Sequence, residues 1–146
     1  MRFSNAPEVK QAFEEVYTQI FKTRFWGLPI TNHRLSVQVV GLRETTDFYT
    51  FSLITPWMLN QVAVPKKEVE TEAIVDGMRL DHLQGLGQFF VTNVVSPMNR
   101  FKSMEIAIRK GERQAEQLFA RISNENKEKL EEISRRDFFL KVRPQK

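Results

Sequence analysis

The sequence predicts an α+β domain, a two-layer sandwich in which a roughly five-stranded antiparallel sheet carries N- and C-terminal helices on one face. Two observations support this class. Apolar residues recur at helical spacing near both ends of the chain, within residues 9–20 and 104–122. Between these segments lie short apolar runs separated by turn residues, which is typical of strands. A length of 146 residues fits a single domain.

The first expected helix begins at a capping sequence. Asn5 is a favoured N-cap residue, Pro7 is tolerated in the first turn, and Glu8 suits the positive end of the helix dipole. The apolar residues of 9–20 then fall on one face, so the helix needs a flat apolar surface to cover. Gly27 and the proline two residues later end the element.

Five strands are expected in the middle of the chain. Alternating or fully apolar runs at 35–39, 48–54, 59–64, 78–82 and 88–95 predict them, with a turn at 41–47. The spacers between the runs are short, which favours an antiparallel meander.

The period changes again after residue 100. Ser103 is an expected helix cap, and 104–122 predicts a second amphipathic helix. Residues 124–136 form a charged helical segment with few apolar positions. We therefore expect one domain over residues 1–137 and a basic C-terminal tail over residues 138–146.

Several kinds of chemistry are excluded by residue type and spacing. The chain has no cysteine, which removes disulfides, thiolate metal sites and cysteine nucleophiles. His33 and His82 lack the spacing of metal ligands, and no phosphate-binding loop or catalytic motif is present. No signal peptide is visible, and the long uncharged stretches contain polar residues and prolines. We expect a cytoplasmic protein without enzymatic activity, cofactor, metal or membrane insertion.

The net charge of +4 is unevenly distributed. Residues 1–97 carry nine Lys/Arg and ten Asp/Glu, whereas residues 98–146 carry thirteen and eight. The basic excess of the last third indicates either an acidic partner or a solvated helix face with a basic tail. The aromatic-rich strands are nearly uncharged and the basic helices are poor in aromatics, so we expect no nucleic-acid binding.

Two apolar corners are candidates for binding an apolar segment of another protein. Each follows a predicted strand and combines proline, methionine and an aromatic residue. A groove would form if both corners lie at one edge of the sheet; the alternative is that both corners cap the core. The candidate client-binding residues are Pro56, Trp57, Met58, Pro97, Met98 and Phe101.

The same residues carry a resemblance to a known family. The motifs are 35–42, Ile54-Thr55-Pro56-Trp57-Met58-Leu59-Asn60 with 62–65, Ser96-Pro97-Met98 with Phe101, and 134–138. In order and spacing they resemble the HybE/HupJ-type assembly chaperones of nickel–iron hydrogenases, over most of residues 9–141. The resemblance implies a fold akin to the two-layer secretion chaperones.

The resemblance also implies partners. These are the precursors of the hydrogenase small and/or large subunit, in particular a small subunit with a twin-arginine signal peptide, whose export is held back until assembly is complete. Other maturation proteins and a homodimer stay open. The alternatives are a type III secretion-like chaperone, which the pI of about 9.5 disfavours, and a small basic nucleic-acid-binding protein.

A second arginine pair lies near the end of the chain itself. Arg135, Arg136 and Phe138 form either an ordinary helix end or a mimic of a twin-arginine signal peptide. For an arginine-bearing client, the acids that offer attraction include Glu68, Glu70 and Glu72.

Overall fold

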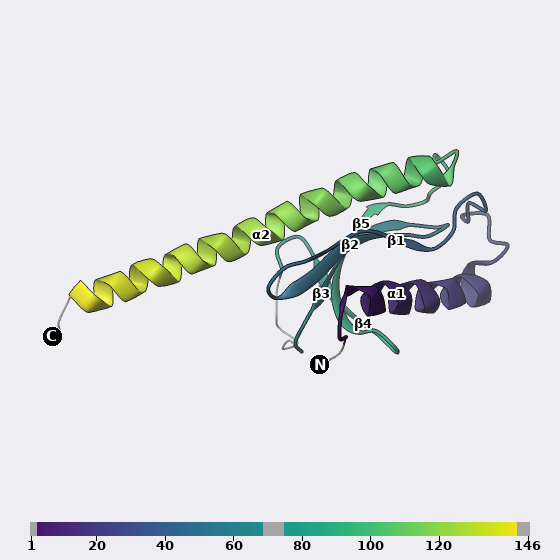
Figure 1. Ribbon diagram of the computed structural model, residues 1–146. Helices are drawn as coiled ribbons and strands as arrows, with labels where there is room; N and C mark the ends of the chain where they lie inside the picture. Colours follow the sequence, from purple (N-terminus) through teal and green to yellow (C-terminus); the bar gives the residue numbers. More distant parts are fainter. Residues whose placement is uncertain (1–2, 69–74, 143–146) are drawn as a thin grey trace.

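The computed structural model describes residues 3–68 and 75–142, with side chains described up to residue 124. Five strands form one antiparallel sheet in the order β1-β2-β3-β5-β4, and two helices lie against it (Figure 1). The elements, in chain order, are α1 (Ala6–Ile20), the π-helical turn η1 (Phe21–Phe25), β1 (Gln38–Glu44), β2 (Phe48–Ile54), β3 (Leu59–Pro65), β4 (Arg79–Leu83), β5 (Gly87–Val95) and α2 (Met104–Val142).

The predicted α+β class is confirmed, and both helices contact the five-stranded sheet. They do so from opposite faces rather than from one (Figure 1). Phe51 points to α1, whereas the next residue, Ser52, bonds α2. The reason is the burial of β2 and β3 on both sides: every residue of β3 is buried. A strand that is apolar on both faces needs a covering layer on each.

The strands do not form a simple meander. β5 pairs with β3, and β4 lies outside β5 at the sheet edge. β5 contributes the buried Phe89, Phe90 and Val91, whereas β4 contains Arg79, Asp81 and His82. An apolar strand gains more from a central position, and a short charged strand suits an edge. The first strand begins at Gln38 instead of residue 35 and runs through the predicted turn to Glu44, with a bulge between Val40 and Arg43.

The start of α1 is as predicted. The Asn5 side chain accepts a hydrogen bond from the backbone N–H of Glu8 at 3.0 Å. On the buried face, Val9, Phe13 and Tyr17 pack on the sheet. The helix does not end at Ile20, because η1 continues it to Phe25.

α2 lies very close to the sheet because small residues line its inner face. Ala107, Gly111 and Ala115 recur every fourth residue and are buried. The Ser52 hydroxyl donates to the Gly111 carbonyl at 2.6 Å. A Cβ placed on Gly111 would lie 2.8 Å from a methyl of Val40, so only glycine fits there.

α2 is one uninterrupted helix through the segments that we predicted separately. Its start is capped as expected, with the Ser103 hydroxyl accepting from the N–H of Ile106 at 3.3 Å. The helix backbone passes the predicted boundary at residue 138. The side chains of Arg135, Arg136 and Phe138 lie outside the described residues, as do Glu70 and Glu72.

Candidate functional site

The two predicted corners meet at one end of the sheet, and Asn32 joins them. Its backbone N–H donates to the Pro56 carbonyl at 2.8 Å. Its side-chain amide donates to the carbonyls of Met98 and Phe101 at 3.0 and 2.8 Å. One loop residue therefore ties together two turns that are far apart in the sequence.

Trp57 is a buried support rather than an exposed contact. Its side chain is 7% exposed and belongs to the core beneath α1. The ring stacks on Phe25 with a centroid distance of 4.1 Å and an interplanar angle of 3°, and more distantly on Phe21 at 6.1 Å. The Thr55 hydroxyl fixes the turn by accepting from the N–H groups of Trp57 and Met58 at 3.2 and 2.9 Å.

The other candidates divide between core and surface. Met98 and Phe101 are buried on the α2 side of the sheet, away from the Trp57 side chain. Pro56 is buried, Met58 is half-buried and Pro97 is exposed. The corners are adjacent, which is the condition that a shared groove requires, but their largest side chains point into separate halves of the core. Their role in client binding stays a prediction.

A surface that the sequence reasoning missed lies directly beside Trp57. We call residues 26–30, Trp-Gly-Leu-Pro-Ile, the apolar loop. Its Trp26, Leu28 and Ile30 side chains are 66%, 41% and 46% exposed. The Trp26 ring contacts Phe21 at 5.4 Å and His33 at 5.1 Å between centroids. Exposed apolar side chains gathered in this way are typical of interaction sites.

The apolar loop is held by hydrogen bonds along its backbone. The N–H of Leu28 donates to the Phe25 carbonyl at 3.2 Å, and the Thr31 hydroxyl donates to the same carbonyl at 2.7 Å. The N–H of Thr31 donates to the Leu28 carbonyl at 3.0 Å. The loop therefore presents its apolar side chains from a defined backbone shape.

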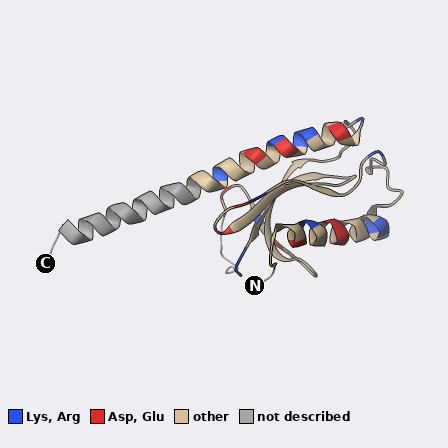
Figure 2. Cartoon of the chain, viewed as in Figure 1, with Lys and Arg blue, Asp and Glu red and all other residues tan. Residues whose placement is uncertain are grey.

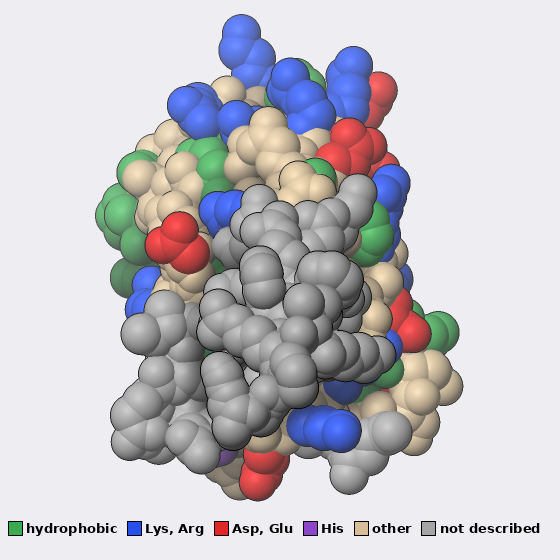
Figure 3. Space-filling model, turned by 90° about the vertical axis from the view of Figure 1, so that its left-hand side faces the viewer, with side chains coloured by type: hydrophobic (Ala, Val, Ile, Leu, Met, Phe, Trp, Pro, Cys, Tyr) green, Lys and Arg blue, Asp and Glu red, His purple; other side chains and the backbone are tan. Residues whose placement is uncertain are grey.

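The charges around the apolar loop are basic. Exposed cations on the surrounding segments are Lys22, Arg24, Arg34, Arg100 and Lys102 (Figure 2). Residues 22–40, 54–60 and 94–104, which lie at this end, contain no Asp or Glu. The next residue, Glu105 in the first turn of α2, is exposed and pairs with Arg109 at 3.5 Å. At the opposite end of the molecule, acidic side chains lie among basic ones (Figure 3).

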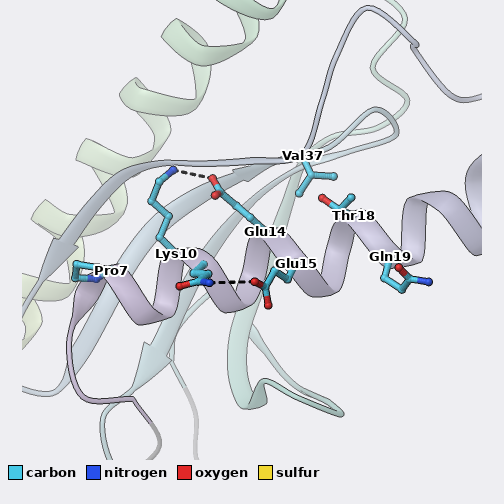
Figure 4. A pocket seen from close by; sticks show the side chains of 8 residues that line it. Pro7, Lys10, Glu14, Glu15, Thr18, Gln19 and Val37 are labelled. Atoms are coloured by element: carbon cyan, nitrogen blue, oxygen red, sulfur yellow. Dashed lines mark hydrogen bonds and ion pairs between the residues drawn. The ribbon is translucent and has the colours of Figure 1, made fainter.

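An open groove runs between α1 and the edge strand β1, and we call it the α1–β1 groove (Figure 4). Its volume is about 710 Å³. Glu14 accepts from Lys10 Nζ at 2.7 Å and from the backbone N–H of Val39 at 2.9 Å, in both cases through Oε2. Glu15 is exposed and accepts from the Gln11 amide at 3.1 Å. The lining residues are Pro7, Lys10, Gln11, Glu14, Glu15, Thr18, Gln19 and Val37.

One ionisable side chain is strongly perturbed. Burial raises the pKa of Tyr17 to about 12, the Asp81 carboxylate adds to the rise, and Arg79 opposes it. Over the residues with described side chains, His, Asp and Glu form no cluster of three or more that is suited to a metal ion. None of the described helices has the length and apolar character needed to cross a membrane.

The missed residues had a signal in the sequence. Phe21, Phe25 and Trp26 form an aromatic run that continues into the apolar loop without an acidic residue. The run follows a helix and precedes a strand, so the pattern by itself predicts only a helix ending. Asn32 has no comparable signal, because its three hydrogen bonds reach segments that only the fold brings near.

Comparisons with known proteins agree with this architecture. A protein-family profile described as "NiFe-hydrogenase assembly, chaperone, HybE" matches residues 8–141. Among solved structures, the solution structure of HybE from Escherichia coli is similar, with a TM-score of 0.50, 22% identity, and coverage of 84% of this chain and 78% of that one. No curated protein matches. Because the profile spans nearly the whole chain, this protein belongs to the HybE family of nickel–iron hydrogenase assembly chaperones.

Proposed function

We propose that this chain acts in the cytoplasm on the precursor of a nickel–iron hydrogenase small subunit, including its twin-arginine signal peptide. Chaperones of the HybE family are non-catalytic and serve hydrogenase assembly. The chain captures an apolar segment of the precursor reversibly and releases it for export once assembly is complete.

The observation that carries this proposal is the exposure of three large apolar side chains on a hydrogen-bonded loop. Trp26, Leu28 and Ile30 offer apolar area that a client segment buries, with a gain of roughly 25 cal/mol per Å². Trp57 supports the loop from below through Phe25. Of the residues predicted at the corners, Met58 and Pro97 lie nearest the surface and extend the contact area.

The two tryptophans have different expected roles, which gives a test. Trp26→Ala removes an exposed ring, so we expect precursor binding to fall at least tenfold with a nearly unchanged melting temperature. Trp57→Ala empties a buried site and should lower the free energy of unfolding by roughly 3–5 kcal/mol. Ile106→Ala is the matched control, because Ile106 is 43% exposed but lies on α2.

The experiment is co-purification of the tagged full chain from hydrogenase-producing cells, with the bound protein identified by mass spectrometry. We expect the small-subunit precursor with the wild type and with Ile106→Ala, and its loss with Trp26→Ala. Equal recovery with all three variants would contradict the assigned surface.

Nucleic acid is the competing occupant, because exposed Trp26 lies within four residues of the exposed cations Lys22 and Arg24 in the chain. Binding to a nucleic acid would weaken steeply with salt, whereas binding dominated by apolar contacts changes little. Recovery of RNA instead of a hydrogenase subunit would overturn the proposal.

A further inference from the structure

We infer that the bound segment lies extended along α1 in one direction, with a basic side chain in the α1–β1 groove and its apolar residues on the apolar loop. This inference rests on the proposed function and assigns two subsites and a polarity to it. Neither subsite alone defines a ligand; their arrangement along one helix does.

The groove offers a place for a cation. Its charged lining residues are one lysine, Lys10, and two glutamates, Glu14 and Glu15, so the carboxylates outnumber the ammonium. Lys10 is already engaged, since its ammonium donates to Glu14 and to the Val39 carbonyl at 3.2 Å. Glu14 accepts its two hydrogen bonds, from Lys10 and from the N–H of Val39, through the same oxygen, Oε2. Glu15 is exposed, and its partner is the neutral amide of Gln11. An entering guanidinium can therefore bond the carboxylates without displacing the Lys10 ammonium.

The groove and the apolar loop follow one another along the same helical segment of the chain. The lining residues follow α1 from Pro7 to Gln19, and η1 then carries the chain to Trp26. At 1.5 Å per helical residue, Glu15 and Trp26 are separated by roughly 15 Å along the axis. An extended peptide covers that distance with about five residues. A segment with a basic residue about five positions before an apolar run fits both places at once.

Charge gives the segment its direction. The loop end carries five exposed cations, and the acidic residue beside them in the first turn of α2, Glu105, is already paired with Arg109. A bound arginine is repelled there and attracted by Glu14 and Glu15. The reversed orientation therefore adds the repulsion and gives up the attraction, and it binds more weakly. The same distribution explains how a chain with a net charge of +4 accommodates a basic client.

The test measures peptide affinity by calorimetry with the full chain. The probe is a synthetic peptide in which an Arg pair precedes a Leu-rich run by about five residues; its control has Gln in place of both arginines. For Glu15→Gln we expect about three- to tenfold weaker binding of the Arg peptide and unchanged binding of the Gln peptide. Glu116→Gln, an exposed glutamate of α2, should change neither.

A second variant distinguishes failure of the basic subsite in the groove from failure of the apolar loop as a binding surface. If Glu14→Gln/Glu15→Gln and Glu15→Gln both bind the Arg peptide as tightly as the wild type, the groove is not the basic subsite. If Trp26→Ala binds both peptides normally, the apolar loop and with it the proposed surface fail. Loss of the Gln peptide with Trp26→Ala, together with an effect of Glu15→Gln confined to the Arg peptide, supports the inference.

Direction is measured by NMR with a nitroxide on either end of the Arg peptide. A label on the arginine end should broaden amides of residues 10–18, and a label on the leucine end should broaden those of residues 26–30. The opposite pattern would overturn the inferred polarity while leaving the proposed function intact.

Discussion

The two faces of the sheet are packed by different means, although the same strands build both. On the α1 face, large rings fill a wide space: Phe13 meets Phe51 and Phe89 edge to face at 5.0 and 5.3 Å. On the α2 face, the first half of the helix presents the small residues Ala107, Gly111 and Ala115 and lies close to the strands, as the 2.6 Å hydrogen bond from Ser52 to Gly111 requires.

The difference explains where the exposed aromatic surface arises. Rings on the α1 face continue from Phe13 and Tyr17 through Phe21 and Phe25 to Trp26, with increasing exposure. A layer built from rings can end in exposed rings at its border, because the border rings still have ring partners: Phe21 and Phe25 stack on Trp57, and Trp26 contacts Phe21. The small residues on the inner face of α2, Ala107, Gly111 and Ala115, offer no such series of rings.

The largest expected effect tests the aromatic layer. Phe13→Ala removes a fully buried ring and both of its edge-to-face contacts, so we expect a loss of about 3–5 kcal/mol in the free energy of unfolding. Leu118→Ala, a fully buried side chain under α2, is the comparison and should cost less. Chemical denaturation measures both; a larger loss for Leu118→Ala would break the contrast between the faces.

The next effect tests the close approach of α2. Gly41 has φ +67°, and a Cβ there would lie 2.5 Å from the Cβ of Ala115. Gly41→Ala should therefore cost about 2–4 kcal/mol, from backbone strain and overlap together. Gly27→Ala is the matched control, since φ is +80° but nothing lies within 4 Å, and about 1 kcal/mol is expected. Equal melting temperatures would show that α2 is free to move away.

The third effect is a dependence on alkaline pH that belongs to the α1 face. The pKa of Tyr17 is about 12 in the folded chain against 10.0 for an ordinary tyrosine, so the folded state holds the proton more tightly. The corresponding stability is complete below pH 10 and is lost as the pH rises toward 12. We expect the wild type to lose up to about 2.5 kcal/mol more than Tyr17→Phe over that interval, measured by urea unfolding. Parallel pH profiles would contradict the burial of this hydroxyl.

The smallest effects compare two hydroxyls on the α2 face of β2. Ser52 bonds Gly111, and Ser52→Ala should cost about 1 kcal/mol. The Thr50 hydroxyl is buried and has no partner among the described residues. Thr50→Val should thus be neutral or stabilise the fold by up to about 1 kcal/mol. Thermal melts of the two variants should move in opposite directions or differ clearly in size.

The elements were predictable wherever one pattern dominated. Asn5 and Ser103 marked the helix starts because a side-chain cap is a local interaction. The strands β3 and β5 followed from apolar runs between turn residues. The faces that the helices cover were not predictable, because β2 is buried on both sides although its α2 face carries the polar residues Thr50 and Ser52. The alternation of polar and apolar residues therefore does not identify an outer face of the sheet.

The candidate site was predictable only in part. The sequence marks both the Trp57 corner and the segment after Ser96 as apolar corners, but only the fold brings them together, through Asn32. It did not decide between core and groove for Trp57, because that depends on η1 placing Phe25 over the ring at 4.1 Å. The one-turn change from α to π geometry has no reliable sequence signature.

The bonds from Lys10 and Glu14 to Val39 also concern aggregation. β1 is an edge strand, and an exposed edge is a template on which a foreign chain can add as a further strand. Here both outward backbone groups of Val39, its N–H and its carbonyl, are occupied by side chains of α1. A chaperone binds incompletely folded chains, so it is exposed to this kind of pairing more than most proteins. Occupying this position removes one place at which a foreign strand could add to the sheet.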